Sequence, residues 1–285
     1  MKITFLGTAS MQPTRERNLS AILLSHDSEN ILIDCGEGTQ RQMKLANVKP
    51  TKITRIIISH FHADHVLGLG GLFRNLAANG YNKTLNIHIP RGTSKFLDNI
   101  INSAYYNNDL KLNIDEFDSG QIFENDKMHI EAFPLSHTVP SFGFVFMEKP
   151  RRKINLSYTS KFGLTKHPML GELQKGRDII YNNKNISAKK ATILVPGKKL
   201  GIILDTCICN NCYVIADNAD LLVAESTFSS EHADKAKEYK HMTSTDAASI
   251  AKKAKSKKLI LTHFSQRYKD DSIILAEAKK IFKNT

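Results

Sequence analysis

The chain has 285 residues, 41% of them hydrophobic, so it is long enough to bury a sizeable core in one large domain. No uninterrupted apolar stretch could cross a bilayer, and the start of the chain lacks the pattern of a secretory leader, so we expect a cytoplasmic protein. Four cysteines are too few for a disulfide framework in a chain of this length.

The formal net charge of +12 is concentrated in one segment. Between Glu148 and Leu200, 13 lysines and arginines stand against three acidic residues, which gives this basic segment a net charge of +10. Concentrated charge of this kind is typical of a surface that binds a polyanion, although some basic segments are simply well solvated. Weak periodicity, prolines and glycines predict a flexible arm at about 149–199, inserted into a single domain that spans 1–285.

Short apolar strands alternate with helices along the chain, which predicts an α/β fold. The strands are expected at 30–33, 55–59, 129–136, 200–204, 221–224 and 258–262. Helices are expected at 38–45, 67–78, 93–105 and 244–257. The last of them should have Ser244 or Thr245 as its N-cap and Asp246 in its first turn.

Each of these strands is followed by a residue that can bind a metal or move a proton. The residues are Asp34, the cluster that begins at His60, and then His137, Asp205, Glu225 and His263. Loops at strand ends converge in layered α/β folds, so we expect these residues to form one site.

The segment 59–65, with the sequence SHFHADH, places three imidazoles and a carboxylate within a few residues. Side chains two residues apart in extended backbone point the same way, so His60 and His62 are expected to share a face. Asp64 and His65 would turn to a second position beside them. Imidazole and carboxylate together suit zinc, manganese or iron, and two groups of ligands indicate two metals rather than one.

Enough ligands are present for two divalent metals, which can hold a phosphate group and generate a nucleophilic hydroxide near neutral pH. The first metal would be bound by His60, His62 and His137, the second by Asp64, His65 and His263, with Asp205 as a bridge. Histidine ligands also need hydrogen-bond acceptors behind them, and Asp34 is a candidate.

Glu225 and His241 remain outside the two ligand groups. A carboxylate that orients an imidazole holds a general acid in the right tautomer, and His241 could then protonate the leaving alkoxide of a phosphodiester. An ordinary surface histidine and a strand-end glutamate would be an equally good interpretation of these two residues alone.

Three cysteines, Cys207, Cys209 and Cys212, form a tight C-x-C-x-x-C pattern. The pattern could hold an extra metal, but Cys35, the fourth thiol, is far away in the sequence. We therefore favour a loop with reduced cysteines over an additional metal site.

The chain resembles the metallo-β-lactamase superfamily, in which H-x-H-x-D-H is followed by separated His, Asp and His ligands. Within it, the chain closely resembles the short-form tRNA 3′-processing endonucleases of the ribonuclease Z family. The matching segments are 5–8, 13–18, 34–40, 59–72, 135–138, 204–206, 224–228, 241–243 and 262–268. The superfamily motif occurs in many hydrolases. Glu225 and His241 within their matching segments, and Ser-Gln-Arg-Tyr two residues after His263, are much more specific to the ribonuclease Z family.

The resemblance implies an αββα sandwich and a homodimer with two Zn²⁺ per subunit, or Mn²⁺ in their place. The implied reaction is cleavage of precursor tRNA after the discriminator base, which leaves a tRNA 3′-hydroxyl and a trailer 5′-phosphate. The family's ligand roles match those given above, with Asp64 also as general base and His241 with Glu225 as the acid pair. The alternative function is a phosphodiesterase of the same fold that acts on a small or cyclic nucleotide.

The resemblance also implies a flexible arm after the strand that ends at His137. In the family this arm holds the elbow of the tRNA for the other subunit, and the basic segment stands at the corresponding place. Neither a membrane nor a protein partner other than the second subunit is implied.

Three positions depart from the usual pattern of the family. Ala63 stands where Gly is usual, and the arm carries His167-Pro168-Met169 where a Gly-Pro-rich element is common. The sequence Cys207-Ile208-Cys209 replaces a typical Arg-Pro-Cys after the bridging Asp205.

Overall fold

The computed structural model describes residues 1–105 and 110–285. It divides into two compact units, the first formed by residues 1–124, 130–146 and 199–285, the second by residues 125–129 and 147–198. Among the described helices, none combines the length and the apolar composition needed to cross a membrane.

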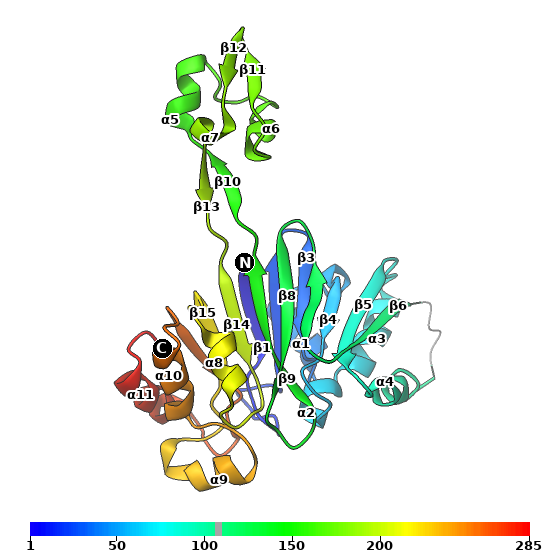
Figure 1. Ribbon diagram of the computed structural model, residues 1–285. Coiled ribbons are helices and arrows are strands. Elements are labelled where there is room, and N and C mark those ends of the chain that lie inside the picture. The colour runs from blue at the N-terminus through cyan, green and yellow to red at the C-terminus, as the bar shows by residue number, and fades with distance from the viewer. Residues whose placement is uncertain (106–109) are drawn as a thin grey trace. The chain divides into compact units, whose positions relative to one another are not determined.

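The first unit contains two six-stranded sheets (Figure 1). In the first sheet the strands lie in chain order, with antiparallel pairing from β1 to β3 and parallel pairing from β3 to β6. Its strands are β1 (Lys2–Gly7), β2 (Ala21–His26), β3 (Glu29–Ile33), β4 (Arg55–Ile57), β5 (Thr84–Pro90) and β6 (Lys111–Phe117).

The second sheet has the order β16-β15-β14-β9-β8-β7, and its strands β14, β15 and β16 are parallel. Its strands are β7 (Gly120–Glu124), β8 (Met128–Leu135), β9 (Ser141–Glu148), β14 (Lys199–Ile203), β15 (Leu221–Glu225) and β16 (Leu259–Thr262). The two sheets face each other: the ring of Phe117 in β6 lies 5.0 Å from Phe142 and 6.1 Å from Phe144 in β9.

Helices pack on the side of each sheet that faces away from the other sheet (Figure 1). In the first layer, buried residues such as Leu32 and Ile56 pack in one cluster with Leu72 and Phe73 of a helix. Since both faces of the central strands are covered, strands such as β4 and β15 are buried almost throughout, whereas the edge strands β6 and β7 are largely exposed. The predicted αββα sandwich is therefore confirmed.

The helices of the first layer are α1 (Thr39–Leu45), η1 (Pro50–Lys52), α2 (Ala63–Val66), α3 (Leu69–Ala78) and α4 (Ser94–Ile101). Those that follow the strands of the second sheet are α8 (Asn210–Ala216), η3 (Ser230–His232), α9 (Ala233–Glu238), α10 (Ser244–Lys253) and α11 (Ser272–Ile281). The helix predicted at 93–105 thus ends at Ile101, and the one predicted at 244–257 ends at Lys253.

The predicted N-cap of α10 is wrong by one residue. Thr243 is the cap, and it forms a capping box in which its hydroxyl accepts from the Asp246 amide while the Asp246 carboxylate accepts from the Thr243 amide. Ser244 is buried and donates its hydroxyl to Glu277 at 2.6 Å, so it has no role as a cap. The capping box fixes the chain directly after His241, which matters for the site described below.

The second unit has a small core of its own, which the sequence did not predict. It has two antiparallel pairs, β10 (Arg151–Ile154) with β13 (Thr192–Val195) and β11 (Ile179–Tyr181) with β12 (Lys184–Ile186). Its helices are α5 (Leu156–Thr159), η2 (Ser160–Phe162), α6 (Leu170–Gln174) and α7 (Ala188–Ala191). The core is formed by Leu164, Leu173, Ile179, Ile186, Ala188 and Ala191.

A buried histidine in β5 makes the stability of the first unit depend on pH. His88 is 4% exposed and contacts the guanidinium of Arg55, and burial together with this neighbour lowers its pKa from 6.5 to about 4. As the pH falls from 6.5 towards 4, the unfolded chain therefore takes up a proton at this residue more readily than the folded chain. This difference destabilises the fold by up to about 3 kcal/mol at the acid end of that range.

We predict that His88→Gln, which keeps an acceptor for Arg55 but cannot titrate, reduces this acid-induced loss. Urea unfolding at pH 7 and pH 4.5 measures the loss of unfolding free energy between the two pH values. This loss should be smaller in the variant than in the parent protein by about 2 kcal/mol. An equal difference in both proteins would contradict the prediction.

Candidate metal centre and acid pair

The candidate site lies where the strand ends of both sheets of the first unit meet. Asp34 follows β3, the segment 59–65 follows β4, and Glu225 is the last residue of β15. His137, Asp205 and His263 stand directly after, or within two residues of, the ends of β8, β14 and β16. The histidines, Asp64 and Asp205 converge in groups of donor atoms within 4.8 Å, and Asp34 and Glu225 join them through hydrogen bonds to His65 and His241, so these strand ends form one cluster.

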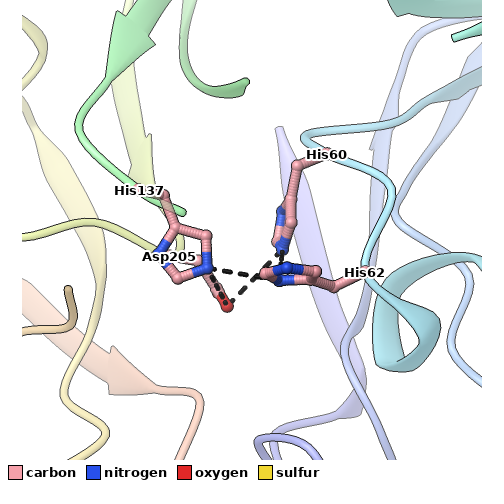
Figure 2. Close-up of side chains that lie close together, drawn as sticks. All are labelled: His60, His62, His137 and Asp205. Atoms are coloured by element: carbon pink, nitrogen blue, oxygen red, sulfur yellow. Dashed lines mark hydrogen bonds and ion pairs between the residues drawn. The ribbon is translucent and has the colours of Figure 1, made fainter. Parts of the chain in front are cut away.

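The first group combines His60, His62, His137 and Asp205 (Figure 2). His62 Nδ1 lies 3.1 Å from His60 Nε2 and 3.2 Å from His137 Nε2. Asp205 Oδ2 is 3.6 Å from His60 Nε2 and 3.8 Å from His137 Nε2. Three nitrogens and one carboxylate oxygen thus surround one position.

The second group combines Asp64, His65 and His263. The Nε2 atoms of His65 and His263 are 3.3 Å apart, and Asp64 Oδ2 lies 3.5 Å from each of them. Asp64 and His65 reach this position because the chain after His62 forms the single helical turn α2. Asp205 Oδ1 lies 3.4 Å from His65 Nε2 and 3.2 Å from His263 Nε2, so Asp205 presents one oxygen to each group.

Each ligand ring has an oxygen acceptor behind the nitrogen that faces away from its group, and this acceptor favours the tautomer with a lone pair on the inward nitrogen. The acceptors are Ser59 Oγ for His60, Thr138 Oγ1 for His62, Asp34 Oδ2 for His65, the Lys240 carbonyl for His137 and Thr227 Oγ1 for His263. The inward lone pairs therefore approach one another at 3.1 to 3.3 Å. A divalent cation between them would make such an approach of lone pairs favourable.

The charges of the site also suit a cation. Asp205 Oδ1 is buried and has no hydrogen-bond partner among the described residues. Burial would raise the pKa of Asp205, but His263 and the other imidazoles outweigh it and hold the pKa well below its ordinary value. Burial lowers the pKa of His60 and of His137, whereas at His65 burial is outweighed by the carboxylates of Asp205, Asp34 and Asp64, which raise the pKa well above 6.5. The cluster therefore attracts positive charge, and imidazoles with ionised carboxylates are the donor set of a divalent metal such as zinc, so these residues fit metal ions.

Asp34 orients one ligand of each group. Its Oδ1 accepts the Ser59 amide at 2.7 Å, and its Oδ2 accepts the Ser59 hydroxyl at 2.7 Å and His65 Nδ1 at 2.6 Å. Ser59 Oγ in turn lies 3.0 Å from His60 Nδ1. The sequence predicted Asp34 as an acceptor behind histidine ligands, and through Ser59 the carboxylate reaches a histidine of each group.

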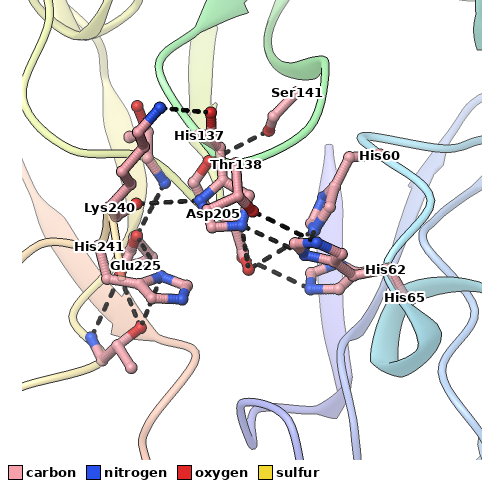
Figure 3. A network of polar contacts seen from close by, with 12 residues as sticks. His60, His62, His65, His137, Thr138, Ser141, Asp205, Glu225, Lys240 and His241 are labelled. Atoms are coloured by element: carbon pink, nitrogen blue, oxygen red, sulfur yellow. Dashed lines mark hydrogen bonds and ion pairs between the residues drawn. The ribbon is translucent and has the colours of Figure 1, made fainter. Parts of the chain in front are cut away.

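Glu225 and His241 form a largely buried ion pair beside the candidate metal ligands (Figure 3). His241 Nδ1 donates to Glu225 Oε1 at 2.9 Å. Glu225 is fully buried and also accepts the Thr206 amide at 2.9 Å and the Thr227 hydroxyl at 2.6 Å. Burial works to lower the pKa of His241, but Glu225 outweighs it and raises the pKa to about 9. His241 is thus held as a cation, with Nε2 free to donate a proton.

His241 also lies close to the second group of ligands. Its ring centroid is 5.4 Å from that of His263, and its donor atom groups with those of Asp205 and His263. His241 could therefore act either as a general acid or as a further metal ligand, and the metal content of a His241 variant distinguishes the two roles.

A cavity of about 570 Å³ opens onto these residues. Besides members of both ligand groups and His241, its lining includes Met11, Phe228, Tyr239 and Arg267. The Met11 amide donates to Asp64 Oδ2 at 2.8 Å, and the Arg267 guanidinium lies 5.3 Å from the centroid of the Phe228 ring.

Sequence reasoning missed several of the groups that complete the site, among them Ser59, Thr227, Thr138, the Lys240 carbonyl and the Met11 amide. Ser59 and Thr227 could have been found, since each is a hydroxyl one or two residues from a candidate site residue in the sequence. The backbone groups could not have been found, because their role does not depend on the type of side chain.

Comparison with known proteins identifies the relatives of the chain. It is 36% identical to ribonuclease Z of Methanothermobacter thermautotrophicus over 99% of this chain and 92% of that protein. It is 38% identical to ribonuclease Z of Chlamydia muridarum over 99% of this chain and 93% of that protein. The chain belongs to the ribonuclease Z family.

Solved structures and a family model agree with this fold. The crystal structure of human tRNase Z, short form, has a TM-score of 0.71 at 28% identity and covers 94% of both chains. The metallo-β-lactamase fold protein YhfI of Bacillus subtilis also has a TM-score of 0.71, over 99% of this chain and 92% of that chain, and at 18% identity it supports the fold alone. Residues 1–200 match the family model described as Anti-Pycsar protein Apyc1.

We predict that Asp34→Ala weakens metal binding by about 10- to 100-fold, because His60 and His65 lose the acceptor that fixes their tautomer. Competition with a chromogenic chelator measures the affinity of the purified protein. Asp118→Ala, which removes an exposed carboxylate paired with Arg91, is the matched control and should bind metal as the parent protein does. Unchanged affinity in Asp34→Ala would show that the histidines need no such acceptor.

Proposed function

We propose that this ribonuclease Z family member is a metal-dependent endoribonuclease that removes the 3′ trailer of precursor tRNA. It cuts after the discriminator base and leaves a tRNA 3′-hydroxyl and a trailer 5′-phosphate. The observation that carries the proposal is the joint presence of two ligand groups, bridged by Asp205, and the Glu225–His241 pair beside them. A cytoplasmic location is part of the proposal.

The ligand groups would hold two Zn²⁺ per subunit, or Mn²⁺ in their place. Bound there, divalent metals would supply Lewis-acid stabilisation of the scissile phosphate and activation of the attacking water. His60, His62 and His137 would bind one of them, and Asp64, His65 and His263 the other. Asp205 would keep the two together through its separate oxygens.

The chain's own residues would move the protons of the reaction. Asp64 Oδ2 accepts the Met11 amide, which orients its carboxylate at the wall of the cavity to act as general base. His241 carries a proton at neutral pH and would donate it from Nε2 to the 3′-oxygen that leaves on the tRNA side. Glu225 holds the tautomer of His241 and stabilises its positive charge.

The basic segment would form an arm that binds the tRNA. All three of its carboxylates are engaged locally: Glu172 pairs with Lys175 and Arg177, Asp178 accepts the Ala188 amide, and Glu148 accepts the Lys198 amide. Further exposed cations of this segment are Arg151, Lys153, Lys161, Lys166, Lys184, Lys189 and Lys190. Such a surface would read the phosphates and the shape of the RNA rather than its bases. We propose that the chain acts as a homodimer in which this arm serves the other subunit.

The proposal is tested with a precursor tRNA that carries a 3′ trailer and a 5′ label. The purified protein, loaded with zinc or manganese, should cut it once next to the discriminator base, and the tRNA product should end in a 3′-hydroxyl. Mapping the cut on the same precursor with and without an encoded CCA shows how that end is treated. A substrate left intact near the discriminator base by metal-loaded protein would overturn the proposal.

We predict that His241→Ala lowers the cleavage rate by about 10²- to 10⁴-fold while the metal content stays unchanged. The loss follows from removing the proton donor without removing a ligand. Single-turnover cleavage and elemental analysis of the same preparation measure the two quantities, with His26→Ala as a control outside the site. Loss of metal in His241→Ala would instead make His241 a ligand.

We predict that removing residues 150–196 abolishes tRNA cleavage but leaves hydrolysis of a small chromogenic phosphodiester within a few-fold of the parent rate. The deletion is feasible because the Glu148 amide donates to the Lys198 carbonyl at 2.9 Å, so a short Gly-Ser turn can join the ends. Lys189→Gln with Lys190→Gln is the gentler variant, and it should weaken tRNA binding and reduce its salt dependence. Retained tRNA cleavage would contradict a role of these residues in binding tRNA, and efficient hydrolysis of a small or cyclic nucleotide by a parent protein that leaves tRNA intact would favour the alternative substrate.

A further inference from the structure

The C-x-C-x-x-C pattern after Asp205 has no part in the proposed reaction. No cysteine belongs to the groups of converging donor atoms in the described parts of the chain, so the geometry gives no support to an additional metal site. Cys207 is held apart: its thiol lies 3.3 Å from Ser136 Oγ, and Ser136 and Cys207 form an isolated β-bridge. The other two thiols are neighbours, with Cys209 Sγ 3.6 Å from Cys212 Sγ.

The backbone around these two thiols is already arranged for a disulfide. Cys209 is the N-cap residue of α8 and Cys212 lies in its first turn, where the Cys212 amide donates to the Cys209 carbonyl at 3.1 Å. A disulfide bond is about 2.05 Å long, so the two sulfurs need to approach each other by about 1.5 Å to form one.

The two thiols differ in reactivity. Cys209 is partly exposed, and hydrogen bonds from the Cys212 thiol and from the Cys212 and Asn211 amides lower its pKa to about 6 despite partial burial. Cys212 is fully buried, and its bond to Cys209 and its burial raise its pKa, so it stays a thiol. An accessible thiolate beside a buried thiol is the arrangement of an attacking and a resolving cysteine.

Thr206 connects this pair to the acid pair. Its amide donates to Glu225 Oε1 at 2.9 Å, and its hydroxyl donates to the Cys207 carbonyl at 2.6 Å. Cys207, whose carbonyl accepts this hydroxyl, stands two residues before Cys209 in the chain. A displacement of Cys209 is therefore passed along a short stretch of backbone to the residue that holds Glu225.

We propose that Cys209 and Cys212 form a redox-active dithiol site that reacts with small-molecule disulfides such as oxidised glutathione, and that its oxidation slows catalysis. The Cys209 thiolate attacks one sulfur of the small disulfide, forms a mixed disulfide and releases one thiolate. Cys212 then attacks Cys209 Sγ and passes its proton to the departing small-molecule sulfur, which forms the Cys209–Cys212 bond and releases the second small molecule as a thiol. Two protein thiols are oxidised while one small disulfide is reduced to two thiols.

The site itself is tested on the full-length, metal-loaded protein, without RNA. After incubation with oxidised glutathione and alkylation of the remaining thiols, the intact mass should show the loss of two hydrogens, and peptide mapping should find Cys209 joined to Cys212. Cys212→Ser should instead trap one glutathione on Cys209, and Cys209→Ser should form neither product. Cys207→Ser is the matched control and should behave like the parent. A bond to Cys207, or four unmodified thiols, would overturn the site.

The effect on catalysis rests on the proposed function and has its own readout. The oxidised protein should cleave precursor tRNA about tenfold more slowly, a smaller loss than complete removal of the acid, and dithiothreitol should restore the rate. The rate of Cys209→Ser should not respond to either reagent. An equal rate in both redox states would overturn the coupling to Glu225. Protein that cleaves in neither state would count against the endoribonuclease proposal, while the mass measurement still decides the dithiol site.

Discussion

The structure of the site depends on one buried carboxylate, Asp205, placed between two sets of imidazoles. Its two oxygens face different groups, and one of them has no hydrogen-bond partner among the described residues. A buried, unpaired carboxylate oxygen surrounded by inward nitrogen lone pairs is costly unless a cation is present. The metal ions would therefore stabilise the junction of the two sheets as well as provide the chemistry, because ligands from both sheets meet there.

Each sheet contributes a second buried carboxylate that fixes the ligands from behind. Asp34, at the end of β3, holds His65 directly and His60 through Ser59. Glu225, at the end of β15, accepts the Thr227 hydroxyl, and Thr227 in turn accepts His263 Nδ1. The same glutamate orients His241, so the acid pair and one metal ligand share a single anchor. A substitution of Glu225 would thus disturb both the proposed acid, His241, and the proposed metal ligand, His263.

The sequence was sufficient to predict the fold class and the residues that meet at the site, because strand ends in a layered fold converge and polar residues follow each apolar strand. It was not sufficient for the N-cap of α10, since the choice between Thr243 and Ser244 depends on Glu277, which captures the Ser244 hydroxyl. The Lys240 carbonyl behind His137 could not be predicted either, because backbone acceptors leave no trace in residue type. The small core of the second unit was missed because its apolar residues have no regular period.

A metal centre alone cannot distinguish one phosphodiester substrate from another, so selectivity and chemistry are expected to lie in different parts of the chain. A cavity of about 570 Å³ has room for only a small part of an RNA, and metal ions with an acid act on any phosphodiester that reaches them. Selectivity for a folded tRNA must therefore come from groups outside the cavity. The charge is distributed accordingly, because the basic segment carries +10 of the total of +12 and leaves the catalytic sandwich nearly neutral. Binding through that charge would weaken with salt, whereas the chemical step, confined to a buried network, would not.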